Sequence, residues 1–112
     1  MKFPAKSGPE FQLEGIKGYA STSASGLKSI DASYLIIDGR RPLTKTTVSD
    51  RIFFVHSGDG TFTIAGKAIP VTTGDFVVIP KNSPFEYLGT MILVEFAAPA
   101  FDPDGEQELE KS

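Results

Sequence analysis

The sequence predicts an all-β protein, a sandwich or a barrel, with one domain and one hydrophobic core. Turn residues, mainly glycine and proline, recur at short intervals along the chain. Between them lie short segments rich in β-branched and aromatic side chains, a pattern typical of all-β sandwiches and barrels. A length of 112 residues suits a single domain, residues 1–112, and leaves no room for a second.

The bulk composition limits the functions that the chain can have. The net charge of −3 provides no basic surface, so we expect no nucleic acid and no membrane surface among its partners. The absence of cysteine excludes disulfides, thiolate zinc sites and cysteine nucleophiles, and it fits a cytoplasmic protein. The N-terminus shows no signal peptide, and no apolar run is long enough to span a bilayer.

The clearest strand candidates, in chain order, are residues 33–38, 51–56, 61–65, 75–79 and 91–97. Residues 61–65 alternate strictly between two kinds of side chain, as a half-buried strand does. The preceding segment 57–60 (SGDG) has two glycines around an aspartate, which predicts a hairpin turn between the second and third candidates. A tight reversal at residues 65–67 leads into a further strand at 68–71. Small polar residues 21–26 predict a loop.

Only the C-terminal end indicates helix. Asp102 stands before Pro103, which is the arrangement of an N-cap followed by proline at the first helical position. Gly105 weakens the helix, and an acidic run follows it. We therefore expect at most a short C-terminal helical turn, with the acidic run frayed on the surface.

Two stretches of the chain carry a recognisable pair of motifs. Residues 74–89, GDFVVIPKNSPFEYLG, contain Gly74, Pro80, Asn82, Phe85 and Gly89 at the motif spacing. Residues 39–58 contain Gly39, Lys45, Thr47, Arg51 and Gly58 at the spacing of the other motif. On these residues, about half of the chain, the protein resembles the cupins, small barrels of the jelly-roll type.

The resemblance implies the fold and the assembly. The fold would be a cupin-type jelly-roll β-barrel, also described as a double-stranded β-helix. The resemblance to small cupins also implies a homodimer. A homodimer is physically reasonable as well, because exposed edge strands must be covered or paired.

The positions at which the cupin motifs place metal ligands hold other residues, namely Lys45, Thr47, Arg51 and Phe85. First-row metals need imidazole, carboxylate or thiolate donors that converge on one point. An ammonium, a hydroxyl, a guanidinium and a phenyl ring do not provide them, and two of the four are cations. We therefore expect no metal and no cofactor.

The same positions suggest a different ligand. If the motif register holds, Thr47 and Arg51 point into the barrel with Lys45 close by, which would suit a small anionic or sugar-like molecule. The alternative is a filled pocket, in which Lys45 extends from the rim to solvent and Arg51 pairs internally. The candidate carboxylates for that pairing are Asp50, Glu86 and Glu95.

Two aromatic side chains also have two interpretations. Phe85 and Tyr87 share one strand face, two residues apart. They could form an aromatic wall on which a ligand stacks, or they could be hydrophobic core, which is the commoner role of aromatic residues. Phe53 and Phe62 are predicted to be core.

Candidates for proton transfer are few. The only histidine, His56, alternates with Arg51 along its strand and therefore faces away from the interior. Asp50 and Glu95 remain, and Glu95 would have a strongly perturbed pKa if it faced inward. The parity of residues 91–97 places Glu95 on the more polar face, which could be the outside or the interior of a barrel. Two tyrosines could also carry hydroxyls into the cavity, Tyr19 and Tyr34.

Three functions remain open. The first is a metal-independent protein that binds a small molecule through Lys45, Thr47 and Arg51, with Phe85 and Tyr87 as the apolar wall. The second is a metal-free isomerase, epimerase or lyase in which the cations stabilise an enolate. The third is a structural barrel with a filled pocket whose surface binds a partner.

Overall fold

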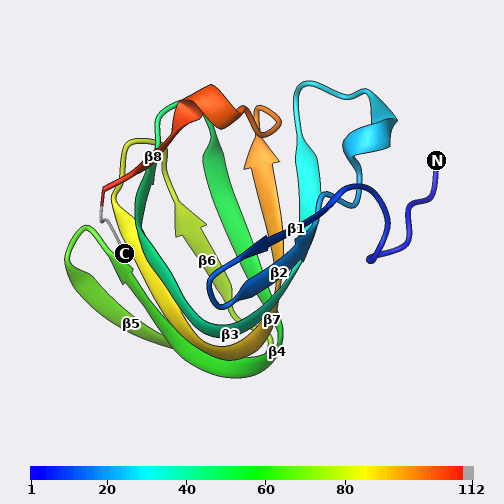
Figure 1. The fold of residues 1–112 in the computed structure, drawn as a ribbon. Coiled ribbons are helices and arrows are strands. Elements are labelled where there is room, and N and C mark those ends of the chain that lie inside the picture. The colour runs from blue at the N-terminus through cyan, green and yellow to red at the C-terminus, as the bar shows by residue number, and fades with distance from the viewer. Residues whose placement is uncertain (110–112) are drawn as a thin grey trace.

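The computed structural model describes residues 1–109 (Figure 1). The strands are β1 (Glu10–Leu13), β2 (Ile16–Tyr19), β3 (Asp31–Thr46), β4 (Asp50–Ile64), β5 (Lys67–Thr72), β6 (Phe76–Ile79), β7 (Phe85–Ala98) and β8 (Glu106–Glu108). Two short 3-10 turns, η1 (Ser23–Ser25) and η2 (Pro103–Gly105), complete the fold. No helix in the described part of the chain is long and apolar enough to cross a membrane. The prediction of an all-β fold is confirmed.

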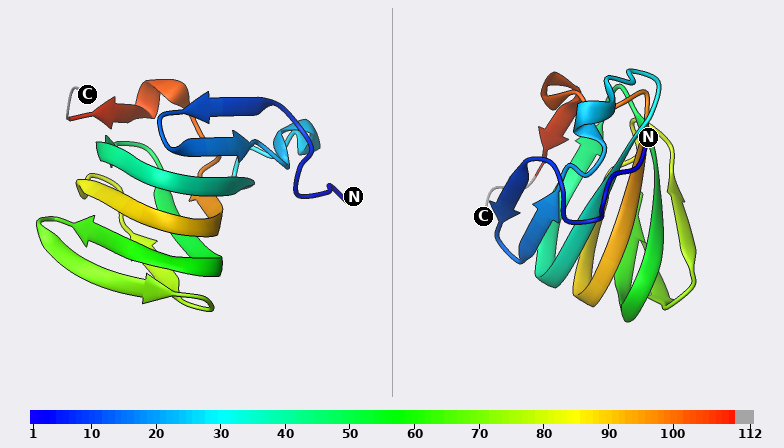
Figure 2. Two further views of the ribbon diagram at one scale, coloured as in Figure 1. Left: turned by 60° about the horizontal axis from the view of Figure 1, so that its bottom comes forward. Right: turned by 90° about the vertical axis from the view of Figure 1, so that its right-hand side faces the viewer.

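The strands form one antiparallel sheet that curls into a barrel. Its order is β1-β2-β3-β7-β4-β5, with β6 paired to β4 and β8 paired to β3. The three central strands, β3, β7 and β4, are long and strongly bent, so that each contributes to more than one wall (Figures 1 and 2). Strands distant in sequence are therefore neighbours, and the barrel depends on long-range pairing.

The hairpin predicted at residues 57–60 is wrong. β4 runs without interruption from Asp50 to Ile64 and pairs with β7 on both sides of a register shift between Val55 and Ser57. The glycines allow a close approach of the two backbones at the bend. A Cβ on Gly58, whose φ is 93°, would lie 2.3 Å from the carbonyl oxygen of Thr90. The glycine signal thus reflects a bent strand and not a chain reversal.

The second predicted reversal is confirmed. β4 ends at Ile64 and β5 begins at Lys67, so Ala65 and Gly66 are the two turn residues. Both have positive φ, 49° and 83°, as two-residue hairpins of the primed type require.

The core fills the inside of the barrel. Its largest fully buried side chains are Phe53, Phe62, Phe85, Ile37, Ile79 and Leu93. The prediction that Phe53 and Phe62 are core is confirmed, since neither side chain is more than 1% exposed. Along β4 the inward positions Arg51, Phe53 and Val55 are buried.

The C-terminal segment is more ordered than the sequence suggested. The predicted N-cap is confirmed, because Asp102 Oδ1 accepts a hydrogen bond of 3.0 Å from the backbone N–H of Asp104, and Pro103 begins η2. The expectation of a frayed acidic run is wrong for residues 106–108, which form β8 against the end of β3. The rest of that run, residues 110–112, lies outside the described residues.

Candidate functional site

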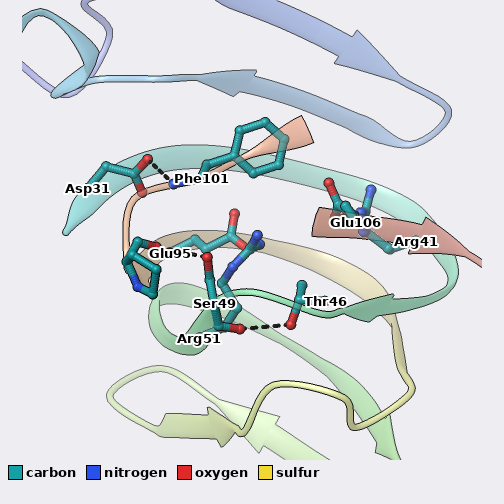
Figure 3. Close-up of polar contacts among 9 residues, drawn as sticks. Asp31, Arg41, Thr46, Ser49, Arg51, Glu95, Phe101 and Glu106 are labelled. Atoms are coloured by element: carbon teal, nitrogen blue, oxygen red, sulfur yellow. Dashed lines mark hydrogen bonds and ion pairs between the residues drawn. The ribbon is translucent and has the colours of Figure 1, made fainter. Parts of the chain in front are cut away.

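One end of the barrel interior carries a cluster of charged side chains from four strands (Figure 3). Arg51 lies on β4 and Glu95 on β7, and the register pairs Arg51 with Ala97 and Phe53 with Glu95. Arg51 and Glu95 are thus diagonal neighbours on the inner face of the sheet. Arg41 of β3 and Glu106 of β8 form a second ion pair nearby.

Arg51 is the most deeply buried charge of the cluster. Its side chain is 4% exposed, and its Nη1 donates a hydrogen bond of 2.6 Å to Glu95 Oε2. The guanidinium carbon lies 5.6 Å from the centre of the Phe101 ring, in a cation–π arrangement. Its Nε is the one buried side-chain polar atom of residues 1–109 without a hydrogen-bond partner. The inward orientation predicted for Arg51 is confirmed, and so is the alternative that it pairs internally, with Glu95.

The other two carboxylates proposed for Arg51 lie elsewhere. Asp50 Oδ1 accepts a hydrogen bond of 2.9 Å from the backbone N–H of Lys81, and Glu86 pairs with Arg40 at 2.9 Å. Glu95, by contrast, faces inward, so the polar side of residues 91–97 is the barrel interior. Burial raises the pKa of the Glu95 carboxyl above its ordinary value, and the nearby guanidinium of Arg51 offsets part of that rise.

The ion pair of Arg41 and Glu106 attaches the C-terminal segment to the barrel. Both side chains are partly buried, 15% and 21% exposed, and they join β3 to β8. Thr47 strengthens the same attachment, because its hydroxyl and its backbone N–H both donate to the carbonyl oxygen of Gly105, at 3.1 and 2.6 Å. The segment from Phe101 to Glu106 therefore lies across this end of the barrel.

The structure separates the three polar residues predicted at the site. A register shift in β3 between Arg41 and Thr44 changes which residues face inward, and Thr44 and Thr46 are the buried hydroxyls. Lys45 and Thr47 are only partly buried on the opposite parity. Thr46 therefore faces inward in place of Thr47. Its hydroxyl donates to the carbonyl oxygen of Ser49 at 2.9 Å. Whether Lys45 and Thr47 bind a ligand stays a prediction.

The two aromatic candidates lie together in the core. Phe85 is 1% and Tyr87 is 2% exposed, and their rings stack with centroids 6.5 Å apart. Phe53 contacts both rings, and Phe62 lies 4.9 Å from Tyr87. This aromatic cluster (Phe53, Phe62, Phe85 and Tyr87) fills the barrel where the sequence allowed either a stacking wall or core.

Tyr87 connects the aromatic cluster with the charged end. Burial raises the pKa of its phenol far above the ordinary value, and the negative charge of Glu95 raises it further. The hydroxyl is therefore a proton donor that stays protonated at any physiological pH.

A cavity of about 410 Å³ opens at the charged end. It lies between the β1–β2 hairpin, β3 and the C-terminal segment, and its lining includes Leu13, Glu14, Arg41, Pro42, Thr44, Phe101, Pro103, Glu106 and Glu108. Phe101 has a double role, because its ring borders the cavity and also covers the guanidinium of Arg51. The backbone N–H of Phe101 donates to Asp31 Oδ2 at 2.8 Å, which fixes its position (Figure 3).

The remaining candidates lie away from this cavity. His56 is exposed, as its strand parity predicted. Tyr19 and Tyr34 are paired in the sheet, and Tyr34 shares the outer face with Val94, so their hydroxyls do not enter the barrel. No group of three or more His, Cys, Asp or Glu side chains that could hold a metal occurs among residues 1–109.

Three residues of the site were not found from the sequence: Arg41, Phe101 and Glu106. Arg41 lies two residues after Gly39 in the first motif, but that position carries no role in the pattern. Phe101 directly precedes the predicted N-cap Asp102, and Glu106 lies in the acidic run that was expected to be frayed. The segment Glu106–Glu108 (EQE) contains only polar residues and is too short for its sequence to predict a strand.

Comparison with known proteins supports a small cupin-fold domain. Residues 38–91 match the family model described as Cupin domain. Comparison with curated protein sequences gave no significant match.

Several solved structures share the whole architecture. Streptomyces Pac13, in a variant bound to uridine, superposes with a TM-score of 0.89 at 23% identity, over 97% of this chain and 90% of that chain. Another Pac13 structure, described as that of a unique nucleoside dehydratase, gives 0.90 at 22% identity, over 98% and 91%. KdgF from Halomonas sp. gives 0.77 at 16% identity, over 91% and 94%. At these identities the likeness establishes the fold alone.

Proposed function

Because the chain is a small cupin-fold domain whose metal-ligand positions hold other residues, we propose that it is a metal-independent small-molecule-binding protein. Its ligand is a small, neutral, polyhydroxylated molecule of the sugar or nucleoside class, bound at the charged end of the barrel. The observation that carries this proposal is the cavity of about 410 Å³ that Arg41, Glu106 and Phe101 border. The binding of uridine by Pac13, a protein of the same fold, supports the class of ligand.

The charges of the cavity favour a neutral ligand over an anion. Arg41 and Arg51 each already contact a carboxylate, so neither guanidinium is an uncompensated positive charge. Glu14 and Glu108 add negative charge to the cavity lining. A carboxylate or phosphate would be repelled there, whereas sugar hydroxyls can donate to glutamate oxygens and accept from guanidinium N–H groups.

Phe101 provides the apolar part of the site. Its side chain is 47% exposed, so one face is available to a ligand while Arg51 lies against it. Sugars and nucleobases both present flat, weakly polar faces that stack on aromatic rings. Arg51 does not line the cavity itself and is connected to it through this contact with Phe101. The binding roles of Lys45, Thr47 and Phe85 remain predictions.

Isothermal titration calorimetry tests this proposal with uridine, neutral monosaccharides, sugar phosphates and dicarboxylates. We expect binding of neutral ligands, and Phe101→Ala should weaken it about ten-fold or more through the loss of stacking. Leu88→Ala is the matched control, since Leu88 is a similarly exposed apolar residue, 52%, outside the cavity lining. Binding of anions alone, or an unchanged affinity in Phe101→Ala, would contradict the proposal.

One observation favours a second function, that of a metal-free enzyme catalysing proton transfer. The buried carboxyl of Glu95 is hydrogen-bonded to Arg51, which contacts the cavity-lining Phe101, and burial raises the pKa of this carboxyl above its ordinary value. Elimination and isomerisation both need a group that removes a proton and one that supplies a proton. The description of Pac13 as a nucleoside dehydratase is consistent with chemistry of this kind on this fold.

Proton NMR of the protein incubated with uridine and with neutral monosaccharides in D2O tests the enzymatic function. We expect exchange of a substrate C–H or loss of a hydroxyl in the wild type, and neither in Glu95→Gln. The variant should still bind the ligand in calorimetry, because the amide keeps a hydrogen-bond acceptor for Arg51. If the wild type binds these compounds but neither exchanges a C–H nor eliminates a hydroxyl, it is not an enzyme for these substrates. The binding function would be unaffected by that result.

A further inference from the structure

A short segment near the C-terminus forms one side of the cavity. We call residues 102–108, which contain η2 and β8, the strap. The strap lies along the edge of β3 at the charged end of the barrel (Figure 1). It supplies Pro103, Glu106 and Glu108 to the cavity lining, while the rest comes from Phe101, β3 and the β1–β2 hairpin. A ligand in the cavity therefore lies between the strap and β3.

The strap has almost no apolar anchor. Its sequence, DPDGEQE, contains no apolar side chain except that of Pro103, which is exposed. Its one buried residue is Gly105, which has no side chain. Release of the strap would thus expose little apolar surface, so the hydrophobic effect provides little resistance to it. Segments with few buried apolar contacts are those that open locally.

Polar bonds hold the strap in place. Thr47 donates two of them, from its backbone N–H and its hydroxyl, to the carbonyl oxygen of Gly105. β8 adds a three-residue pairing with β3, and the backbone N–H of Leu109 donates to the carbonyl oxygen of Leu43 at 2.8 Å. The partly exposed ion pair between β3 and β8 contributes little, because water screens it. All these contacts join the strap to β3 and the loop that follows it, so they can break together.

The chain before the strap is fixed to the barrel. The backbone N–H of Phe101 donates to Asp31 Oδ2 at 2.8 Å, and Ser49 Oγ donates to the carbonyl oxygen of Pro99 at 2.8 Å. Neither bond involves the strap, so both remain when the strap leaves β3. The hinge therefore lies at Asp102, whose backbone is extended, and the ring of Phe101 stays beside the cavity.

We propose that the strap is a lid, which opens at Asp102 and closes over a ligand that lies against β3. The closure over a ligand rests on the proposed function, whereas the opening does not. A ligand that bonds to both Arg41 and Glu108 has its full set of contacts only when the strap is closed. Such a ligand shifts the strap toward the closed state by its higher affinity for that state. Closure also removes the cavity from bulk water, as lids do in enzymes.

Hydrogen exchange of the ligand-free protein, measured by NMR, tests the opening. The backbone N–H groups of Thr47 and Leu109 report it, because their bonds join the strap region to the barrel. Both should exchange about 100-fold faster than the slowest amides of β4 and β7, and their exchange should not respond to low urea concentrations. If both exchange as slowly as the centre of the sheet, the strap opens only when the whole barrel unfolds. That result would overturn the proposal.

The same measurement tests the closure with uridine or, if uridine does not bind, with a neutral monosaccharide that does. At about 100 times the dissociation constant, exchange at Thr47 and Leu109 should slow about 100-fold, because only the closed form binds. The amide of Ala65, which donates to the carbonyl oxygen of Pro84 outside the cavity lining, is the control and should not change. Binding in calorimetry without slower exchange would contradict the lid and leave the proposed function intact. If neither compound binds, the proposed function fails, whereas the ligand-free exchange still decides whether the strap opens.

A disulfide that locks the strap tests its role in binding. Lys45→Cys and Gln107→Cys place two thiols on directly opposed residues of β3 and β8, neither of which lines the cavity. Opposed Cα atoms lie about 4.5–5.5 Å apart, within the range that a disulfide spans. Oxidation of this double variant should lower the association rate constant of the same ligand about ten-fold or more, and reduction should restore it. Both states carry the same substitutions, so the loss of Lys45 does not affect the comparison.

Gln107→Cys alone, treated with the same oxidant, is the matched control and should bind at the rate of the wild type. The chain has no cysteine of its own, so no other intramolecular disulfide can form. Equal association rates in the oxidised and reduced double variant would show that the ligand enters without movement of the strap, and the lid would be rejected.

Discussion

The two ends of the barrel interior are built by the same strands and have opposite chemistry. At one end β4 and β7 contribute Phe53, Phe62, Phe85 and Tyr87, which pack ring against ring. At the other end the same inner faces contribute Arg51 and Glu95, which form an ion pair beside the cavity. The aromatic end derives its stability from burial, whereas the charged end holds groups that cost free energy to desolvate. The comparison separates the part that stabilises the barrel from the part available to a ligand.

The largest expected effect comes from the aromatic end. Phe53→Ala removes a 1% exposed ring that contacts three others, and it should lower the free energy of unfolding by about 4 kcal/mol. Urea denaturation at fixed protein concentration measures this loss. Leu88→Ala, at an exposed position, should change the value by no more than about 0.5 kcal/mol. A loss of less than about 1 kcal/mol in Phe53→Ala would mean that this end repacks easily and is not the stable part.

The next effect belongs to the buried ion pair. Arg51→Met leaves the Glu95 carboxylate buried without its partner, which should cost about 3 kcal/mol in the same urea experiment. The double variant Arg51→Met/Glu95→Leu should recover most of this loss, because no buried charge remains. If the double variant has the same free energy of unfolding as the single one, the ion pair contributes more to stability than its desolvation costs. The charged end would then stabilise the barrel, as the aromatic end does.

The pH dependence of the free energy of unfolding tests whether burial raises the pKa of Glu95. Its pKa is raised in the folded protein, so the folded state binds this proton more tightly than the unfolded state does. The resulting stabilisation is complete below the unfolded pKa and is lost as the pH rises through the folded pKa. The unfolding free energy of the wild type minus that of Glu95→Gln should therefore decrease as the pH increases above about 4.3. A flat difference across that range would show that burial does not perturb this carboxyl.

The smallest effect is expected where the charged end is most exposed. Glu106→Gln removes the ion pair with Arg41 and should reduce global stability by about 1 kcal/mol or less. Hydrogen exchange should nevertheless speed up at the backbone N–H groups of Thr47 and Leu109, which bond across this segment. Glu86→Gln, which removes a more exposed pair on another part of β3, should leave these two amides unchanged. Equal exchange in both variants would argue that the ion pair does not hold the segment.

The candidate site was only partly predictable. The inward orientation of Arg51 follows from its motif position, whereas strand parity left open whether Glu95 faces inward and whether Tyr87 is wall or core. Thr46 replaced Thr47 on the inner face because a register shift in β3 changes the parity, and sequence does not reveal such a shift. Arg41, Phe101 and Glu106 meet only through the pairing of β8 with β3 and the bond between Phe101 and Asp31.

The sequence by itself determined the all-β fold, because turn spacing and alternation are local properties of the chain, and the spacing of the two motifs indicated a barrel through the resemblance to cupins. The tertiary structure alone decided whether Arg51 is paired or free, whether Phe85 and Tyr87 are wall or core, and where the cavity lies. Each of these depends on residues far apart in the chain, as the separation of 44 between Arg51 and Glu95 illustrates. Residues 57–60 show the limit of prediction from sequence. Glycines permit both a turn and a close approach of strands, and only the position of β7 distinguishes the two.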